Sequence, residues 1–412
     1  MQNVAITGLG LLAPIGSEPE AFWRSLIHGS SGIARITRFD PTSYVCQVAG
    51  EVHDRSYEEL IDPRKLRTTT HVTQLALGAT ELALRDARLP VGAYDPAATG
   101  VSVGTALGGW REGEQQYGIL LERGARRVNP FIASGAPLHN PTAEIAAAVK
   151  AQGSQTTYST GCPASLQAIG YGAALIANGE LDICLAGGVE SPLSPVVIAA
   201  MGRTQELAAG DSDPQRMSRP FDRQHAGMVL SEGGCFVVLE SAAGARRRGA
   251  RVYAEVAGFA SSSDALGVYG YDPSGEPGAA AIHRLLARAM VSPVDVDYVC
   301  AHANSSPAFD LKETVVIKKA FGECAARLPI SSIKGVLGHP FGASGAFQVA
   351  TACLAIREGI IPPTHNLDEP APGCDLDYVP GQARSAELRH VLVTSYGYGG
   401  VNAYLLLTAP GA

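Results

Sequence analysis

Two kinds of apolar segment alternate along the chain. Short runs rich in β-branched residues are typical of buried strands, and longer runs rich in Ala and Leu are typical of helices. The strands expected from the short runs span residues 4–7, 100–104, 182–187, 235–240, 252–256, 297–302, 390–395 and 402–407. The helices expected from the longer runs include residues 70–86, 163–177 and 344–357. The alternation predicts an α/β protein built in layers.

Two of these helices begin in similar surroundings. Segments 161–187 and 342–362 each open on a turn of Gly and other small residues and continue as an apolar helix that stops near a Gly. A Gly at that point suits the end of a helix. One copy carries Cys162 at the helix start, and the other carries His339 just before it. The similarity predicts two repeated halves, residues 1–245 and 246–412.

Composition and charge exclude several classes of protein. The chain of 412 residues is 46% hydrophobic and 17% charged, against about 25% charged residues in an average globular chain. A disordered chain or a coiled coil is therefore not expected, and the net charge of −7 argues against general polyanion binding. No apolar stretch reaches about 18 residues, so no membrane span is expected. Residues 1–16 lack the basic start of a signal peptide, and the eight cysteines lack CxxC spacing, which favours a reducing cytoplasm.

Cys162 has the sequence setting of a nucleophile. It lies in the segment STGCPAS, which follows a β-prone run and opens a predicted helix. Such a strand-to-helix turn projects the side chain away from the sheet and puts the sulfur at the positive end of the helix dipole. This position lowers a cysteine pKa from about 8.5 into the range of roughly 3.5–7.5. A small, buried structural cysteine is the alternative.

Two histidines lie in comparable turns. His302 ends a predicted strand and begins the motif HANSSP, and His339 lies within KGVLGHPFGASG. The ends of strands in open α/β sheets are common functional positions. Their separation along the chain is not a metal-ligand spacing, so no metal is expected. Beside Cys162, the two histidines predict an acyl-transfer site.

The motifs TGCPAS, HANSSP, KGVLGHPFGASGA and SYGYGGVN, in that order, resemble those of the β-ketoacyl-acyl-carrier-protein synthases of fatty-acid and type II polyketide synthesis. The resemblance covers essentially the whole chain. It implies the thiolase fold, with two repeated halves stacked as a five-layered α/β/α/β/α unit that is normally dimeric. It also implies a decarboxylative Claisen condensation between a Cys-bound acyl chain and a malonyl unit on an acyl carrier protein, without a cofactor.

The resemblance assigns roles to individual residues. Cys162 would accept the acyl group, and His302 and His339 would hydrogen-bond the thioester carbonyl of the malonyl unit and stabilise its enolate. The backbone N–H groups of Cys162 and Tyr398 would form the oxyanion hole, with Tyr398 as the gating aromatic. Lys334 would hold charge near the histidines, paired with Glu313 or Asp310. The substrate-binding residues that the resemblance implies are Asn304, Ser306, Met201, Met228 and Trp110. For Met201, Met228 and Trp110, packing in the core is the alternative.

Several positions depart from the family pattern. Asn304 and Ser306 stand where the family has two threonines, and Tyr398 carries a hydroxyl that the usual Phe lacks. Gln348 replaces a Glu that many members have. These departures favour a specialised polyketide or polyene pathway over housekeeping fatty-acid synthesis.

Basic residues form local groups despite the negative net charge. Arg64, Arg126 and Arg127 are expected to dock the acidic acyl carrier protein by charge attraction. The run 246–251 is a second basic group, which we interpret as the end of a helix. The partner within the dimer is expected to be a second copy of this chain or a chain-length-factor homologue.

Other functions fit the motifs less well. A non-catalytic chain-length partner subunit commonly has Gln where Cys162 stands, so the Cys and both His residues argue against it. A degradative thiolase usually has a second Cys in its C-terminal glycine turn, and the turn SYGYGG has none. A chain-initiating synthase has Asn where His339 stands. A cysteine hydrolase needs a base and an orienting acid, whereas two neutral His donors suit decarboxylation.

Overall fold

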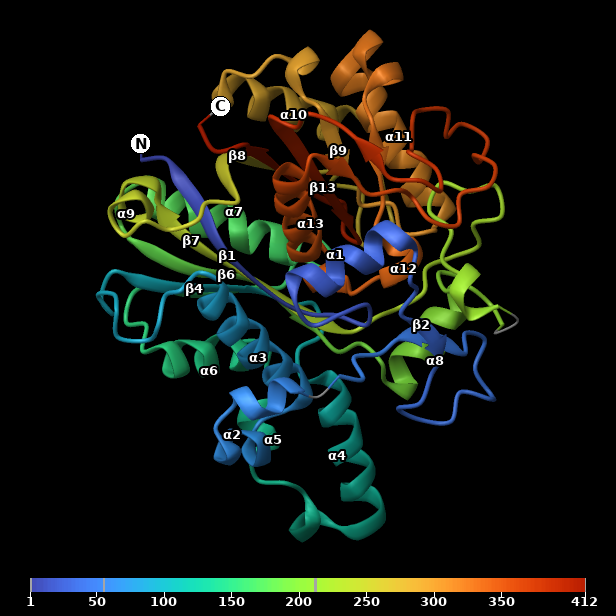
Figure 1. Cartoon of the computed structure of the whole chain (residues 1–412). Coiled ribbons are helices and arrows are strands. Elements are labelled where there is room, and N and C mark those ends of the chain that lie inside the picture. Colours follow the sequence, from blue (N-terminus) through green and yellow to red (C-terminus); the bar gives the residue numbers. More distant parts are fainter. Residues whose placement is uncertain (1, 55, 211–212, 412) are drawn as a thin grey trace.

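The computed structural model describes residues 2–54, 56–210 and 213–411, and a long mixed sheet runs through it (Figure 1). In the first half its strands are β1 (Val4–Leu12), β4 (Thr99–Gly104), β5 (Gln155–Tyr158), β6 (Ile183–Glu190) and β7 (Gly233–Ser241). In the second half they are β8 (Ala254–Ser263), β9 (Tyr298–Cys300), β10 (Ile330–Ser331), β13 (His390–Gly397) and β14 (Val401–Thr408). Two small hairpins complete the strands: β2 (Ile33–Arg35) with β3 (Val48–Gly50), and β11 (Ile360–Ile361) with β12 (Arg384–Ser385).

The order of the strands repeats between the halves. From the centre outwards the first half reads β1-β7-β6-β4-β5, and the second reads β8-β14-β13-β9-β10. In both, the outer three strands are parallel to one another and the inner two run antiparallel to their neighbours. The halves join where residues 4–6 of β1 pair with residues 254–256 of β8. The predicted internal duplication of the fold is confirmed.

Helices form three layers around this sheet. The central layer consists of α7 (Ala164–Ala177) and α13 (Ser344–Glu358), which pack on each other and on strands of both halves. The outer layer of the first half is α3 (His71–Asp86) with α6 (Asn140–Val149), and that of the second half is α10 (Glu276–Ala289) with α11 (Pro307–Phe321). Figure 1 shows these layers in order from bottom to top. The five-layered thiolase arrangement implied by the sequence is therefore present.

The central helices are apolar on nearly every side. Most residues of α7 and α13 are buried, and both helices are rich in Ala and Gly. Such helices cannot face water and instead bury their surface between the two halves of the sheet. The first turns of α7 and α13 meet in the middle of the molecule, where the Ala346 N–H donates to the Ser165 hydroxyl. This layer matters for function because it brings the segments just before the two helices close together.

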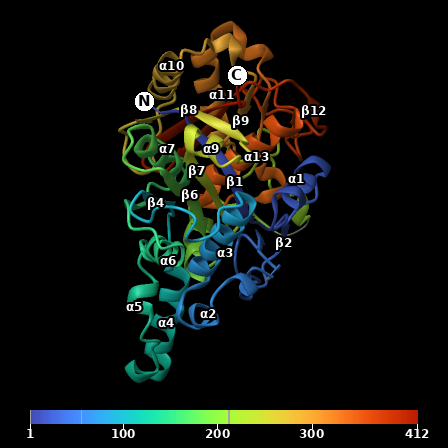
Figure 2. The ribbon, with the colours of Figure 1, turned by 60° about the vertical axis from the view of Figure 1, so that its left-hand side comes forward.

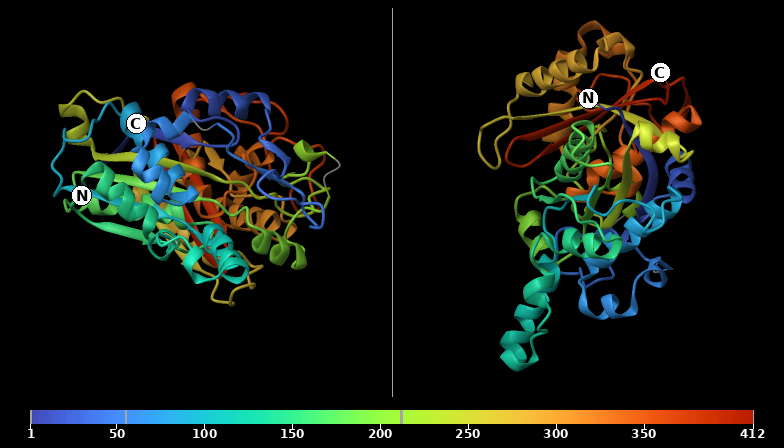
Figure 3. Two further views of the ribbon diagram at one scale, coloured as in Figure 1. Left: turned by 90° about the horizontal axis from the view of Figure 1, so that it is seen from below. Right: turned by 90° about the vertical axis from the view of Figure 1, so that its left-hand side faces the viewer.

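One helix projects from the body of the protein. In Figures 2 and 3, α4 (Trp110–Arg123) extends away from the layers together with the turn that follows it. None of its residues is buried. The remaining helices are α1 (Pro19–His28), α2 (Pro63–Thr68), α5 (Ile132–Gly135), α8 (Pro195–Arg203), α9 (Ala242–Arg247) and α12 (Lys334–Leu337). No helix in the described ranges is both long enough and apolar enough to cross a membrane.

Candidate active site

Cys162 lies in a sharp turn between strand β5 and helix α7. The strand ends at Tyr158, and the helix begins at Ala164 directly after Pro163. Gly161 takes a φ of +69°, a left-handed value that favours glycine and lets the chain reverse just before the cysteine. Only 4% of Cys162 is exposed. The strand-to-helix turn expected from the sequence is present.

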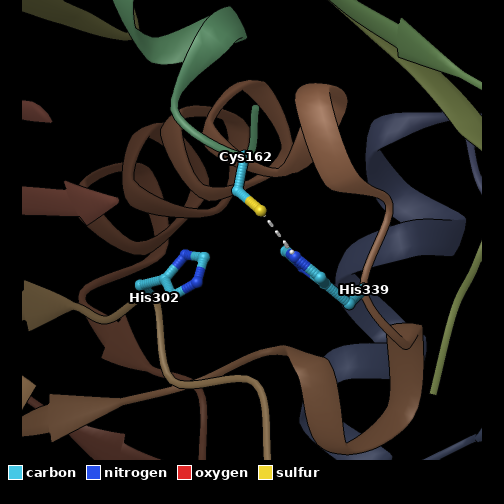
Figure 4. Close-up of side chains that lie close together, drawn as sticks. All are labelled: Cys162, His302 and His339. Carbon is cyan, nitrogen blue, oxygen red and sulfur yellow. Dashed lines mark hydrogen bonds between the residues drawn. The ribbon is translucent and has the colours of Figure 1, made fainter. Parts of the chain in front are cut away.

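Side chains from three separate segments meet around the sulfur (Figure 4). His302 follows strand β9, and His339 follows helix α12. The Sγ of Cys162 lies 3.1 Å from Nε2 of His339, and the centroids of the two imidazole rings are 5.3 Å apart. One ligating atom from each of the three residues lies within 4.8 Å of the others. Residues predicted from three separate turns thus form one cluster.

Both imidazoles are neutral near pH 7. Burial, and then the charge of Lys334, lowers the pKa of His302 and that of His339 well below the usual 6.5. Nδ1 of neither ring has a hydrogen-bond partner in the described part of the chain. A neutral imidazole donates a hydrogen bond from one nitrogen and accepts at the other. The pair therefore offers donors to a substrate oxygen without carrying a charge of its own.

The same three side chains are potential metal ligands. Sulfur and imidazole nitrogen are atoms that zinc prefers, and tetrahedral zinc sites bring such atoms equally close. A zinc ion held by Cys162, His302 and His339 would occupy the sulfur and block its use as a nucleophile. The cluster can therefore either bind zinc or use the thiol as a nucleophile, but not both at once. The apolar pocket described below favours the nucleophile.

The thiol of Cys162 is protonated at rest. Burial raises its pKa to about 12, the charge of Lys334 lowers it, and Glu190 raises it further. The expectation of a lowered pKa at the helix start is therefore wrong. The reason is that loss of hydration destabilises the thiolate more than the helix end and the nearby lysine stabilise it. The Nε2 atom of His339, in contact with Sγ, is positioned to accept the proton instead.

Lys334 and Glu313 support His302 from behind, but not as the expected ion pair. The Lys334 ammonium donates to the carbonyl oxygen of His302. The Glu313 carboxylate accepts from the N–H groups of His302 and Ala303 at 2.9 and 2.7 Å, and from the Thr394 hydroxyl. Within the described residues no direct ion pair joins Lys334 to Glu313 or Asp310, because each group is bonded to the turn around His302. The charges of both carboxylates still stabilise the Lys334 ammonium from a greater distance and raise its pKa against the effect of burial. Burial lowers the pKa of Lys334 to about 8 and raises that of Glu313 to about 7.

Two backbone N–H groups beside the sulfur are unpaired. Among residues 2–54, 56–210 and 213–411, neither the N–H of Cys162 nor that of Tyr398 donates to an oxygen. The turn that carries Tyr398 lies against Cys162, since a Cβ added to Gly397 would come within 3.3 Å of the Cys162 nitrogen. Two free donors at one side of a nucleophile are the usual composition of an oxyanion hole.

An apolar pocket of about 350 Å³ opens beside Cys162. Trp110 and Met201 line it, as does Tyr398. Trp110 is 51% exposed, so the pocket reaches the surface at the base of α4. Met228 was also expected at the substrate, but it is fully buried in the adjoining apolar cluster and is not among the residues that line the pocket. The pocket can hold an aliphatic or polyene chain that ends at the sulfur.

Two family models together match most of the chain. Beta-ketoacyl synthase, N-terminal domain, matches residues 1–245, and Beta-ketoacyl synthase, C-terminal domain, matches residues 253–368. The chain belongs to the β-ketoacyl synthase family. This membership confirms the resemblance seen in the four ordered motifs, and with it the assignment of the chain as an acyltransferase-type condensing enzyme.

Named relatives of this β-ketoacyl synthase match it over nearly their full length. The 3-oxoacyl-[acyl-carrier-protein] synthase 2 of Coxiella burnetii is 36% identical over 407 residues, covering 99% of this chain and 98% of the relative. The tetracenomycin polyketide synthase ketoacyl synthase alpha subunit of Streptomyces glaucescens is 39% identical over 415 residues, covering 99% and 97%. The structure of the ishigamide ketosynthase/chain length factor aligns with a TM-score of 0.93 at 31% identity and covers 100% of both chains.

The HANSSP segment of this β-ketoacyl synthase is buried behind His302. Asn304 is 1% and Ser306 is 3% exposed. The Asn304 side-chain oxygen accepts from the Ser306 N–H at 3.1 Å, while its Nδ2 lies 3.5 Å from Nε2 of His302. Ser306 is the residue directly before helix α11. Asn304 therefore lies against the His302 ring and also shapes the turn.

The three arginines expected to dock a carrier lie on the surface. Arg64 is in α2, and Arg126 and Arg127 are in the turn after α4; all three are exposed. Their side chains form no ion pair with any described residue. By contrast, Arg248 is paired with Glu240 inside the protein. Arg64, Arg126 and Arg127 are therefore available to a partner. In the basic run 246–251, Arg248 already forms an ion pair within the chain.

Glu190 is a site residue that the sequence analysis missed. It ends strand β6, is fully buried, and accepts from the N–H groups of Ala106 and Leu107 at 2.7 and 3.1 Å and of Gly342 at 3.1 Å. Burial raises its pKa to about 7. It joins two turns that form part of the pocket wall. Its only signal in the sequence was a lone acidic residue at the end of an apolar strand.

Proposed function

We propose that this protein is a β-ketoacyl-[acyl-carrier-protein] synthase in which Cys162 carries the growing acyl chain. The observation that carries the proposal is the cluster of one thiol and two neutral imidazoles at the inner end of an apolar pocket. The reaction is a decarboxylative Claisen condensation in fatty-acid or type II polyketide synthesis. A polyketide or polyene pathway is the preferred setting, because the family positions around His302 and the gate are altered.

In the first step Cys162 takes the acyl chain from its carrier. The thiol proton moves to Nε2 of His339, and Sγ attacks the carbonyl carbon of the carrier-bound thioester. The N–H groups of Cys162 and Tyr398 stabilise the oxyanion of the tetrahedral intermediate. Collapse of the intermediate breaks the bond to the phosphopantetheine sulfur, which takes the proton and leaves as a thiol. The acyl chain then lies in the pocket beside Trp110 and Met201.

In the second step the malonyl thioester becomes the carbon nucleophile. Once the sulfur is acylated, Nε2 of His339 has no thiol proton to accept, and the neutral ring adopts the tautomer with its proton on Nε2. In that form His339, together with His302, donates a hydrogen bond to the thioester carbonyl of the malonyl unit. The bond to the carboxylate breaks, CO₂ leaves, and the electron pair forms an enolate held by the two donors. The enolate carbon attacks the acyl group on Cys162, and the sulfur leaves and takes up one proton. Neutral donors suit this step because they stabilise the enolate oxygen without protonating the carbon.

Four further residues position the reacting groups under this proposal. Lys334 and Glu313 fix the backbone at His302, and the positive charge of Lys334 helps to keep both imidazoles neutral. Asn304 and Ser306 bind the pantetheine arm in place of the two threonines of the family. Met228 acts only indirectly, through the packing of the pocket wall.

The proposed partners are an acyl carrier protein and a second synthase subunit. Attraction between the exposed Arg64, Arg126 and Arg127 and an acidic carrier guides docking. The second subunit is another copy of this chain or a chain-length-factor homologue, as in the ishigamide ketosynthase/chain length factor. Residues 1–245 then supply the nucleophile and residues 246–412 both histidines. We place the reaction in the cytoplasm, where the thiol stays reduced.

Decarboxylation of a malonyl carrier separates the role of the histidines from that of the cysteine. We expect His302→Ala and His339→Ala each to lower CO₂ release about 100–1,000-fold, the usual effect of losing one donor to an oxyanion. The melting temperature should change little. His283→Ala, on the outer helix α10, is the matched control and should release CO₂ at the wild-type rate. Full CO₂ release by either active-site variant would remove that histidine from the mechanism.

A further inference from the structure

A buried ionic cluster lies beside the turn that carries Tyr398, where Asp264 contacts Gly400. Lys312 comes from helix α11, Asp264 follows strand β8, and Asn402 belongs to strand β14. They are 3%, 7% and 0% exposed. The mechanism uses none of them. A lysine is rarely buried to this extent unless its charge is paired, so its presence here calls for a function.

The three side chains form a closed triangle of hydrogen bonds. The Lys312 ammonium donates to the Asp264 carboxylate at 2.5 Å and to the Asn402 side-chain oxygen at 2.8 Å. The Asn402 amide nitrogen donates to the second Asp264 oxygen at 2.7 Å. The ammonium also lies 5.1 Å from the centre of the Tyr396 ring, in the range of a cation–π contact. Every charged atom of the cluster is therefore compensated.

The cluster is bonded to both segments that cover Cys162. Asp264 N–H donates to the Gly400 carbonyl at 2.9 Å, and Gly399 N–H donates to the Val268 carbonyl at 2.7 Å. These bonds fix the turn between β13 and β14 to the loop that follows β8. Tyr398 projects from that turn and lines the pocket at Cys162, where its ring meets that of Tyr269 edge to face with centroids 6.2 Å apart. The position of Asp264 thus determines the position of the turn.

Removal of the ammonium would leave the Asp264 carboxylate buried without a counter-charge. An unpaired buried carboxylate is strongly unfavourable, and it recovers hydration by moving towards water. Because the Asp264 N–H donates to the Gly400 carbonyl, a shift of Asp264 either breaks this hydrogen bond or moves Gly400 with it. The expected response is an outward shift of the loop after β8 together with the Tyr398 turn. The Asn402 amide and the Asp272 N–H, which donates to the same carboxylate at 3.2 Å, cannot prevent this, because neither group carries a charge.

We propose that Lys312 is a positioning residue that holds the Tyr398 turn closed over Cys162 by pairing with Asp264 and Asn402. This inference rests on the proposed function, in which Tyr398 gates access to the thiol. It assigns the two buried lysines different tasks. Lys334 supports the backbone of the reacting His302, and Lys312 supports the turn that closes the opposite wall.

The test compares Lys312→Met with the wild type in two measurements that need no substrate. The rate of Cys162 alkylation by iodoacetamide, followed by intact mass, reports access to the thiol. Hydrogen exchange of residues 264–272 and 397–401 reports opening of the two segments. Lys318→Met is the matched control, since Lys318 lies on the same helix but is 41% exposed and paired at the surface with Asp375. The double variant Lys312→Met/Asp264→Asn removes both charges together.

We expect alkylation of Lys312→Met to be about tenfold faster and exchange to rise in those two segments alone. The control should match the wild type, and the double variant should return to within about threefold of it. If Lys312→Met is alkylated and exchanges hydrogen at the same rates as the wild type, the proposal is overturned. If that variant does not fold, Lys312→Gln is measured with the same criteria. If neither folds while the double variant reacts as the wild type does, the charge serves folding alone and the gating role is rejected.

The measurements distinguish failure of the positioning role from failure of the proposed function. If the wild-type protein takes no acyl group from a carrier, the function is rejected, and alkylation and exchange still report whether Lys312 holds the turn. If the wild type condenses normally and Lys312→Met is unchanged in both measurements, only the positioning role fails.

Discussion

At the scale of single residues, the site joins a protonated thiol to uncharged imidazoles. The turn motifs indicated Cys162, His302 and His339 as candidates, with a structural role as the alternative, and the four ordered motifs of the family assigned their roles. The structure brings the three side chains together. The protonation state of the thiol could not be predicted in the same way. It depends on burial by segments far away in the chain, among them the turn of Tyr398, and the local motif contains no information about them.

The pH dependence of Cys162 alkylation tests this state. Because burial raises the thiol pKa to about 12, the thiolate fraction should grow across the whole range from pH 7 to pH 9. The thiolate is the reactive form, so the iodoacetamide rate should rise about tenfold for each pH unit, without a plateau. Cys162→Ala gives the background from the other cysteines. A plateau reached by pH 7 would show a thiolate already formed at rest.

At the scale of elements, the strong apolar patterns predicted α3, α7, α13 and eight of the ten strands of the large sheet. Strands β5 and β10, which are short, were not among the predicted strands, and β1 and β8 extend beyond their predicted ends. Helix α4 was not among the predicted helices, because its exposed positions have no apolar face to bury within this chain. Helix α11 was not predicted, because it contains charged residues that are typical of an exposed surface. In the structure some of these residues, such as Lys312, are buried and paired. The polar residue Lys312 in this helix belongs to the buried ionic cluster beside the Tyr398 turn and does not face water.

The join between β4 and α7 sets the position of Cys162. Gly104 ends β4, and a Cβ built on it would lie 2.2 Å from the backbone of Ala164 and Ser165. Gly104→Ala should therefore push the start of α7 away, lower stability by about 1–3 kcal/mol and reduce acyl transfer. Gly118→Ala is the control, since a Cβ there meets nothing within 4 Å and sits in a helix. Thermal unfolding of both variants measures the effect, and equal stability would contradict this close contact.

At the scale of the whole molecule, one surface lacks a partner within the chain. Trp110, Tyr117 and Leu121 are 51%, 62% and 69% exposed, and their spacing places them along one side of the projecting α4. Trp110 also lines the pocket of the active site. Exposed large apolar side chains along one side of a helix are typical of a subunit interface. The second subunit that we propose would cover this stripe and close the outer end of the acyl pocket.

A charge placed on this stripe should separate the subunits. We expect Leu121→Glu to weaken association about 30-fold or more, as the loss of a central interface contact does. Glu122→Lys changes the charge of the neighbouring exposed residue and serves as the control. Sedimentation of the purified oligomer over a dilution series measures both. Unchanged association of Leu121→Glu would place the interface elsewhere.

Whether Cys162 carries the acyl chain is tested by mass spectrometry of the protein after incubation with an acyl-carrier-protein thioester. We expect one added acyl group on the peptide that contains Cys162, no adduct in Cys162→Ala, and loss of the adduct with release of CO₂ when malonyl carrier is supplied. An acyl group retained by Cys162→Ala, or found on another cysteine, would contradict this expectation.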